Sequence, residues 1–289
     1  MLKRFKNLLY FLCLVHSLVF AQNSATEPAE TQEEKQYRET MQSLKWVQGP
    51  TTVNVGSNAS FKLPEGYVFL EKEDTYKLMQ LMHNPGHKSS YYFGPKNMEW
   101  FALFTYEDTG HINDDEKIDA DALLTSFKQG SEISNKERQK QGWEPLHIIG
   151  WLYAPFYDPQ TKRLDWALNL ESGGHSVVNY NTRILSRTGV TSSTLVAGPE
   201  QLSKVVPEFK TALNGYKFNN GEQYAEYRKG DKTAEYGLMA LIAGGAAAVA
   251  TKKGLWAVVG GFLVSFWKII AAGVAIFYAF ISKFFKRNH

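Results

Sequence analysis

The sequence predicts an α+β domain in which an antiparallel β-meander sheet packs with two to three helices, followed by a C-terminal transmembrane helix or helical hairpin. Three observations support this class. Residues 147–197 alternate apolar and polar side chains between turn residues, as half-buried antiparallel strands do. Helical patterns lie on both sides of that region, at residues 119–141 and 199–214. Residues 237–281 are almost wholly apolar, which is typical of a membrane segment.

The first residues have the three parts of a secretory signal peptide. Lys3, Arg4 and Lys6 are its positive region, residues 8–20 are its apolar run, and Ala21 is a small residue at the cleavage position. The apolar run is about 13 residues long, short of the roughly 20 that span a bilayer. We therefore expect cleavage after Ala21 rather than an uncleaved N-terminal anchor.

Composition excludes several functional classes. The only cysteine, Cys13, lies in the signal, so the mature chain would have no disulfide, Cys nucleophile or thiolate metal site. The net charge is +3, and much of the basic excess lies at the two ends of the chain. A nucleic-acid surface would need a basic stripe on the folded body. We expect no nucleic-acid partner, no metal and no cofactor.

Changes in composition divide the chain into six segments. In order, they are a signal peptide (1–21), a polar leader (22–45), a periplasmic α+β domain (46–220), a charged tether (221–236), a membrane anchor region (237–282) and a basic tail (283–289).

The first half of the domain mixes short strands with helices. Strands are predicted at 51–55, 59–63, 67–70 and 100–106, and helices at 74–82 and from Asp119 or Asp121 to Gln141. After the meander, Pro199 opens a helix to about Asn214, and Pro207 inside it is expected to kink or split it.

Two strands of the meander alternate most clearly, at residues 163–171 and 175–186. Ser172-Gly173-Gly174 joins them, and a three-residue loop would pair Glu171 with His175 and place Trp166 opposite Tyr180. A two-residue turn would instead set apolar residues opposite polar ones. Because a slip of one residue moves a whole strand to the wrong face, we expect the three-residue loop.

In that register the polar side chains of both strands share one face. The candidate ligand-binding residues are Asp165, Glu171, His175, Asn179, Asn181 and Arg183. An imidazole, carboxylates and amides on rigid strands could bind a polar ligand or support acid–base chemistry. The other interpretation is the ordinary solvated face of an antiparallel sheet.

Two other patterns do not fit metal sites. His83 and His87 have the spacing of two helical ligands, but Pro85 and Gly86 between them break a helix. The acidic run that begins at Asp108 lacks the alternating carboxylates and distal Glu of a calcium loop.

The apolar C-terminal region is compatible with two topologies. Residues 237–250 are too short to span a bilayer alone, whereas residues 255–281 are long enough. Lys252 and Lys253 lie between them and could form the cytoplasmic turn of a hairpin; with a single span, the basic tail would end in the cytoplasm. Lys268 falls near the middle of the longer segment, either as a functional charge or at a helix contact.

Several short motifs recur in a characteristic order. They are Gly49-Pro50, Leu63-Pro64-Glu65-Gly66-Tyr67, Tyr106-Glu107-Asp108-Thr109-Gly110, Gly150-Trp151, the run from His175 to Arg183, and Tyr236-Gly237-Leu238. With them the chain resembles a bacterial family of membrane-anchored proteins, domain-of-unknown-function family 2167, over nearly everything after the leader. The resemblance implies a bacterial inner-membrane setting, with the main domain facing the periplasm, and no established activity. More distantly, the Leu-Pro-Glu-Gly opening is similar to α+β domains of the PsbP/Mog1 type.

These observations lead to one main functional expectation. We expect a membrane-anchored envelope protein that acts as a non-enzymatic binding or scaffolding module, with the lipid bilayer and an envelope protein or a second copy as partners. The alternative is a membrane-tethered hydrolase that uses the polar face around His175.

Overall fold

The structure is a computed structural model that describes residues 32–82, 88–140 and 144–244. The chain divides into two compact units, residues 1–36 and residues 37–289, and the architecture below is that of the second unit. The predicted signal peptide, most of the predicted anchor region, Lys268, His83 and His87 lie outside the described residues.

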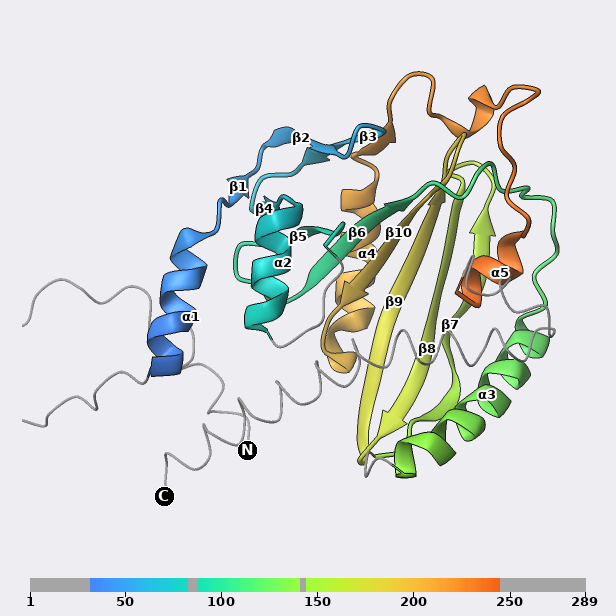
Figure 1. The fold of residues 1–289 in the computed structure, drawn as a ribbon, viewed down its shortest axis with the longest axis horizontal. Helices are drawn as coiled ribbons and strands as arrows, with labels where there is room; N and C mark the ends of the chain where they lie inside the picture. Colours follow the sequence, from blue (N-terminus) through green and yellow to red (C-terminus); the bar gives the residue numbers. More distant parts are fainter. Residues whose placement is uncertain (1–31, 83–87, 141–143, 245–289) are drawn as a thin grey trace, which may run out of the picture. The chain divides into compact units, whose positions relative to one another are not determined.

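An eight-stranded antiparallel sheet runs through this unit (Figure 1), with strand order β1-β4-β5-β6-β10-β9-β8-β7. Its strands are β1 (Val47–Gln48), β4 (Tyr67–Leu70), β5 (Tyr91–Pro95), β6 (Phe101–Glu107), β7 (His147–Asp158), β8 (Arg163–Ser172), β9 (His175–Leu185) and β10 (Val190–Val196). A second sheet has the order β11-β3-β2, and its strands are β2 (Thr51–Val55), β3 (Ala59–Leu63) and β11 (Tyr216–Phe218). The predicted α+β class with a large antiparallel sheet is confirmed.

Few helices accompany the sheets. They are α1 (Gln32–Ser43), α2 (Lys72–Leu81), α3 (Ala120–Lys140), α4 (Leu202–Leu213) and the short α5 (Leu238–Ile242), with 3-10 turns at Pro199–Gln201 and Tyr224–Glu226. Pro207 lies inside α4, which runs unbroken through it. The expected split does not occur, because the apolar residues on both sides of Pro207 recur at helical spacing and are buried together.

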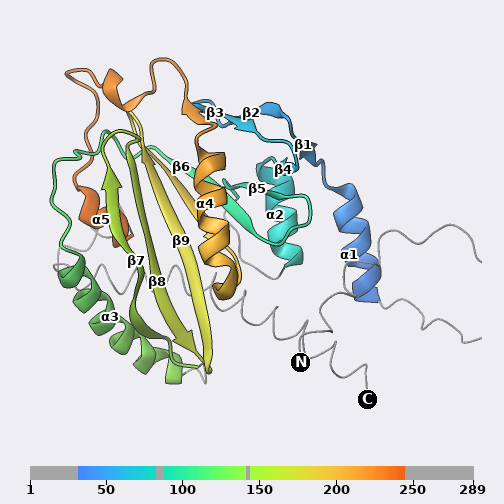
Figure 2. The same ribbon diagram turned by 180° about the vertical axis from the view of Figure 1, so that it is seen from behind.

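Both faces of the large sheet are covered. Figure 2 looks onto the face that α4 covers, where Phe209 packs with Phe61, Phe93, Phe104 and Tyr180 in one apolar cluster that also includes the small sheet. On the other face, α3 and α5 pack over β7 and β8 in a second cluster. The helix α2 packs over β4 and β5 in a third. Buried aromatic rings dominate the first cluster, with Phe61 and Phe93 edge to face at 4.8 Å.

The β8–β9 hairpin turns through two residues, so the predicted three-residue loop is wrong. Ser172 pairs with His175, Asp165 with Thr182 and Trp166 with Asn181. Gly173 and Gly174 have φ of 56° and 76°, as a two-residue hairpin turn of type I′ requires. The prediction assumed that one face of the hairpin is buried and the other is exposed to solvent. Because helices cover both faces, the polar side of β9 is buried too, and alternation alone does not fix the register.

The segment expected to be a charged tether is held against the domain. The Arg187 guanidinium donates to both carboxylate oxygens of Asp231, at 2.7 and 2.6 Å, and His111 forms a parallel bridge with Thr233. Beyond this segment, α5 buries Leu238 and Ile242 in the core. The domain therefore extends past the expected boundary at residue 220. Within the described ranges, no helix is long and apolar enough to cross a membrane.

We predict that Gly174→Ala lowers the free energy of unfolding of the full-length chain by about 1 kcal/mol, because an L side chain is strained at positive φ. Urea unfolding followed by near-ultraviolet circular dichroism measures the change. Gly150→Ala in β7 is the matched control, since a Cβ there meets nothing within 4 Å and its φ is not positive. Equal effects at the two positions would contradict the two-glycine turn.

Candidate functional site

Helices α2, α3 and α5 flank one face of the large sheet (Figure 1). The middle strands of that face carry a group of polar residues. On β10, Ser192 pairs with Thr105 of β6 and with Arg183 of β9, and Thr194 pairs with Asn181 of β9. Val190 of the same strand belongs to the α3–α5 cluster, and Val196 packs against the α2 cluster. The polar rows thus lie between two apolar clusters. We call this surface the polar strip: Thr105, Asn179, Asn181, Arg183, Ser192 and Thr194.

Hydrogen bonds within β9 and between neighbouring strands fix the strip. The Asn181 amide donates to the carbonyl of Asn179 at 3.1 Å and accepts from the Thr194 hydroxyl at 3.2 Å. The Ser192 hydroxyl donates to the Glu107 carboxylate at 2.8 Å. Asn181 is 5 % exposed, whereas Ser192 and Thr194 are only partly buried. The strip is therefore a rigid surface with a buried side at β9 and an accessible side at β10.

Arg183 is the charged group of the strip. Its guanidinium lies 4.9 Å above the Trp166 ring, an arrangement in which the ring face attracts the cation. Its Nη1 donates to the carbonyl of Thr182 at 3.2 Å. Burial lowers the pKa of Arg183 to about 10, against the opposing influence of Glu107 and Tyr236, so it remains charged at neutral pH. Among the described residues, no carboxylate forms an ion pair with it.

The predicted acidic residues lie on the other face, so the prediction of one shared polar face is wrong. Asp165 accepts from the Thr182 hydroxyl at 2.7 Å and from Lys210 of α4 at 2.9 Å. Glu171 alternates with Asp165 on β8 and is exposed. Burial and, after it, Asp165 raise the pKa of the Tyr180 phenol. Asp165 therefore has structural partners already.

His175 is described only by its backbone, which opens β9 and pairs with Ser172. The placement of its side chain lies outside the described part of the structure. Of the six predicted residues, the structure brings three together, namely Asn179, Asn181 and Arg183, and moves Asp165 and Glu171 away from them.

Sequence reasoning missed the other members of the strip. Trp166, which borders the strip, was expected opposite Tyr180 but lies opposite Asn181, with its indole beneath Arg183. Thr194 and Ser192 come from Thr191-Ser192-Ser193-Thr194, a run of four hydroxyl residues in β10. That run is the signal that could have identified the strip, since alternate hydroxyls of one strand share a face.

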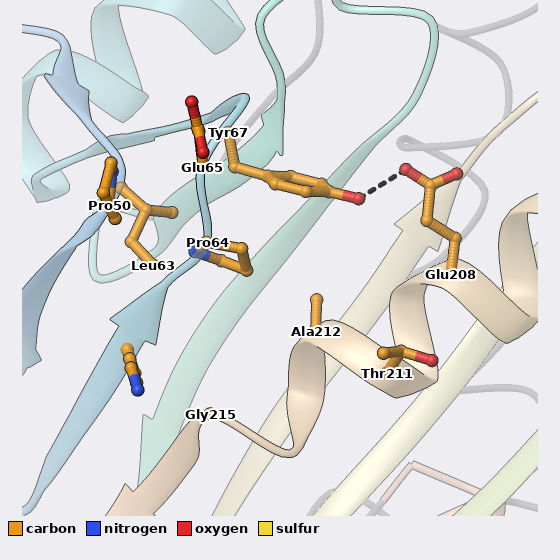
Figure 3. Close-up of a pocket in the computed structure, with 10 residues that line it drawn as sticks. Pro50, Leu63, Pro64, Glu65, Tyr67, Glu208, Thr211, Ala212 and Gly215 are labelled. Carbon is orange, nitrogen blue, oxygen red and sulfur yellow. Dashed lines mark hydrogen bonds between the residues drawn. The ribbon is translucent and has the colours of Figure 1, made fainter.

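A groove of about 660 Å³ lies on the α4 side of the molecule (Figure 3). Its lining residues are Pro50, Lys62, Leu63, Pro64, Glu65, Tyr67, Glu208, Thr211, Ala212 and Gly215. The Tyr67 hydroxyl donates to the Glu208 carboxylate across it. Burial, reinforced by Glu208, raises the pKa of Tyr67. The phenol is thus neutral at ordinary pH and serves as a donor.

Two of the sequence motifs meet at this groove for a packing reason. The Gly49 amide donates to the Tyr67 carbonyl at 3.0 Å. A Cβ on Gly49 would lie 1.8 Å from the Pro64 carbonyl oxygen, so only glycine fits between the two chains. Gly49-Pro50 and the Leu63–Tyr67 motif are therefore explained by close backbone approach.

No group of three or more His, Cys, Asp or Glu residues that could hold a metal occurs in the ranges described. In the acidic run, Asp114 accepts from Tyr157 at 2.5 Å and from Lys162 at 2.7 Å. These bonds tie the loop before α3 to β7 and to the β7–β8 turn, so Asp114 is a structural residue.

Fold and site together define an α+β domain whose large antiparallel sheet carries a buried polar strip on one face. Residues 47–275 match the family model described as "Protein of unknown function (DUF2167)", and the chain belongs to this family. The predicted membership of domain-of-unknown-function family 2167 is confirmed, while the membrane anchoring that the resemblance implied stays a prediction.

Comparisons with individual proteins add little to this family assignment. No curated protein matches the chain significantly. Among solved structures it is similar to the solution structure of cyanobacterial PsbP (CyanoP) from Synechocystis sp. PCC 6803. The identity is 11 % and the TM-score 0.35, and the match covers 61 % of this chain and 92 % of that one.

We predict that Asp165→Ala destabilises the full-length chain by about 1–3 kcal/mol, because the fully buried Thr182 hydroxyl would lose its acceptor. Lys210→Met removes a second partner of Asp165. Because the Lys210 side chain is 45 % exposed, this substitution should lower the free energy of unfolding by less than about 1 kcal/mol. Urea unfolding measures both. An Asp165→Ala protein as stable as the parent would show that Asp165 is not the structural residue described here.

Proposed function

We propose that the chain is a membrane-anchored module of the bacterial cell envelope that binds a ligand or a partner protein through the polar strip, and that it is not an enzyme. The observation that carries this proposal is the assembly of Asn179, Asn181 and Arg183 on one rigid, mostly buried surface. Polar groups fixed in this way recognise a complementary group without paying to order their own side chains.

The location rests on the two ends of the chain. The N-terminal signal pattern directs the domain out of the cytoplasm. The apolar residues after α5 are numerous enough to reach across a bilayer at least once. The domain boundary supports this arrangement, because the folded unit continues to α5 and leaves no long tether before the apolar segment.

The hydrolase alternative would need the imidazole of His175 beside an acidic partner. Asp165 already accepts from Thr182 and Lys210 on the α4 side. Glu171 shares that side by the alternation of β8. Asp165 and Glu171 therefore face away from the polar strip, which argues against acid–base catalysis by these two carboxylates and favours binding.

Photo-crosslinking in cells tests the binding role. A photoreactive amino acid at Thr194, at the accessible side of the strip, should give an intermolecular adduct on illumination. The same residue at Thr52, exposed on β2, is the control. Intact mass spectrometry distinguishes a small ligand, a partner protein and a second copy. No adduct at Thr194, or equal adducts at the two positions, would overturn the proposed binding role of the strip in cells.

Cysteine labelling tests the location. If signal cleavage removes Cys13, the parent protein is unlabelled by a thiol reagent and serves as the background. In intact spheroplasts a membrane-impermeant maleimide should label Ser57→Cys, which lies on the β2–β3 turn. Asn288→Cys should be labelled only after lysis with a single span, and without lysis with a hairpin. Labelling of Ser57→Cys only after lysis would contradict an exported domain.

A further inference from the structure

We infer that the polar strip is a carboxylate-binding site in which Arg183 makes the principal contact. This inference rests on the proposed binding function and names the chemical class of its ligand. The carboxylate belongs either to a small free acid or to the C-terminus of a polypeptide. Both present the same planar anion to the guanidinium.

The first argument is that Arg183 has no ion-pair partner among the described residues. The residue is 6 % exposed, and only one of its five N–H donors has a partner among the described residues. Three other cations of the domain meet carboxylates within 3.0 Å, namely Arg187 with Asp231, Lys162 with Asp114 and Lys210 with Asp165. Arg163 instead donates to two neutral acceptors, Asn214 and the Leu213 carbonyl. A buried cation without an anion is unfavourable. A ligand anion would supply the ion-pair partner that Arg183 lacks among the described residues.

The second argument is that further donors lie beside Arg183. The Trp166 Nε1–H is fully buried, and no acceptor reaches it in the described part of the chain. The Asn179 amide makes no side-chain hydrogen bond there either, although the residue is 9 % exposed. Asn181 lies opposite Trp166 and between Asn179 and Arg183 on β9, and its amide oxygen accepts a hydrogen bond from Thr194. These unused donors lie along one face of β8 and β9, with Trp166 directly beneath the Arg183 guanidinium.

Charge and shape favour a carboxylate over a phosphate. Arg183 is the only cation of the strip, and the carboxylate of Glu107 contributes to its electrostatic surroundings. A dianion would meet more repulsion from Glu107 than a monoanion would. A planar carboxylate can accept two parallel hydrogen bonds from one guanidinium. The rest of the ligand would then lie along Ser192 and Thr194, on the accessible side.

Nuclear magnetic resonance of the purified full-length chain, with ¹⁵N-labelled tryptophan, tests the inference. Sodium acetate should move one indole N–H resonance until it saturates, and Trp166→Phe should remove that resonance. Sodium chloride at equal ionic strength should leave it in place. No movement with acetate, an equal movement with chloride, or tighter binding of inorganic phosphate would each overturn the carboxylate assignment.

Two peptide probes distinguish the sources of the carboxylate. Tetra-alanine with a free C-terminus should move the Trp166 resonance, and its C-terminal amide should not, if the ligand is the end of a polypeptide. Acetate that moves the resonance when neither peptide does would identify a small acid. Equal movement by the free and amidated peptides would contradict recognition of a carboxylate.

Substitution of Arg183 separates binding from folding. Arg183→Met removes an uncompensated buried charge and should fold with an unchanged or higher melting temperature, yet lose the response to acetate. Arg187→Met, which breaks the ion pair with Asp231, should melt lower and keep that response. If Arg183→Met does not fold, Asn179→Leu should weaken acetate binding about tenfold. Acetate binding of parental strength in a folded Arg183→Met or in Asn179→Leu would overturn the inference.

The outcomes also separate this inference from the proposed function. A Thr194 adduct in cells without any carboxylate response would leave the binding surface standing and overturn its ligand class. A carboxylate response without a Thr194 adduct would leave the site standing and overturn the proposed cellular partner.

Discussion

The pairing of β8 with β9 is the constraint on which the candidate site depends. The two positive φ angles of Gly173 and Gly174 close the hairpin in two residues, and this turn sets Trp166 opposite Asn181 and Leu164 opposite Arg183. The guanidinium of Arg183 therefore lies over an indole ring instead of beside the carboxylate of Asp165. A shift by one residue would reverse both environments.

Coverage of the sheet explains why this pairing is tolerated. A strand exposed on one face keeps polar side chains in water, and a register with polar opposite apolar residues would then be unfavourable. Here α4 packs on one face, while α2, α3 and α5 pack on the other. Asn181 and Arg183 are buried beside the α3–α5 cluster and gain hydrogen bonds or a ring contact in exchange for water.

Local patterns in the sequence were sufficient to predict most individual elements. The strands 51–55, 59–63 and 67–70 and the long helix after Asp119 follow from alternation, turn residues and capping. The face of each residue within β8 or β9 was also predictable, since side chains alternate strictly along a strand.

The relation between neighbouring strands was not predictable in the same way. Register depends on tertiary burial of both faces, and a window of one hairpin carries no information about α3, α4 or α5. For the same reason the expected tether at residues 221–236 is packed. Its charges Asp231 and Glu222 are satisfied by Arg187 and by Thr188, which are far away in sequence.

The two opposite charges Asp165 and Arg183 have different kinds of interaction partner in the sheet. They occur on adjacent strands, and a direct pair between them would have satisfied both. The register instead gives Asp165 an internal cation, Lys210, and a hydroxyl donor, Thr182. Arg183 receives a ring face and one carbonyl. Folded domains are only marginally stable, so a buried charge without an ion-pair partner among the described residues lowers the free energy of unfolding noticeably. Such a cost is understandable where the missing anion comes from a ligand, and this places the functional surface on the Arg183 side of the sheet rather than on the Asp165 side.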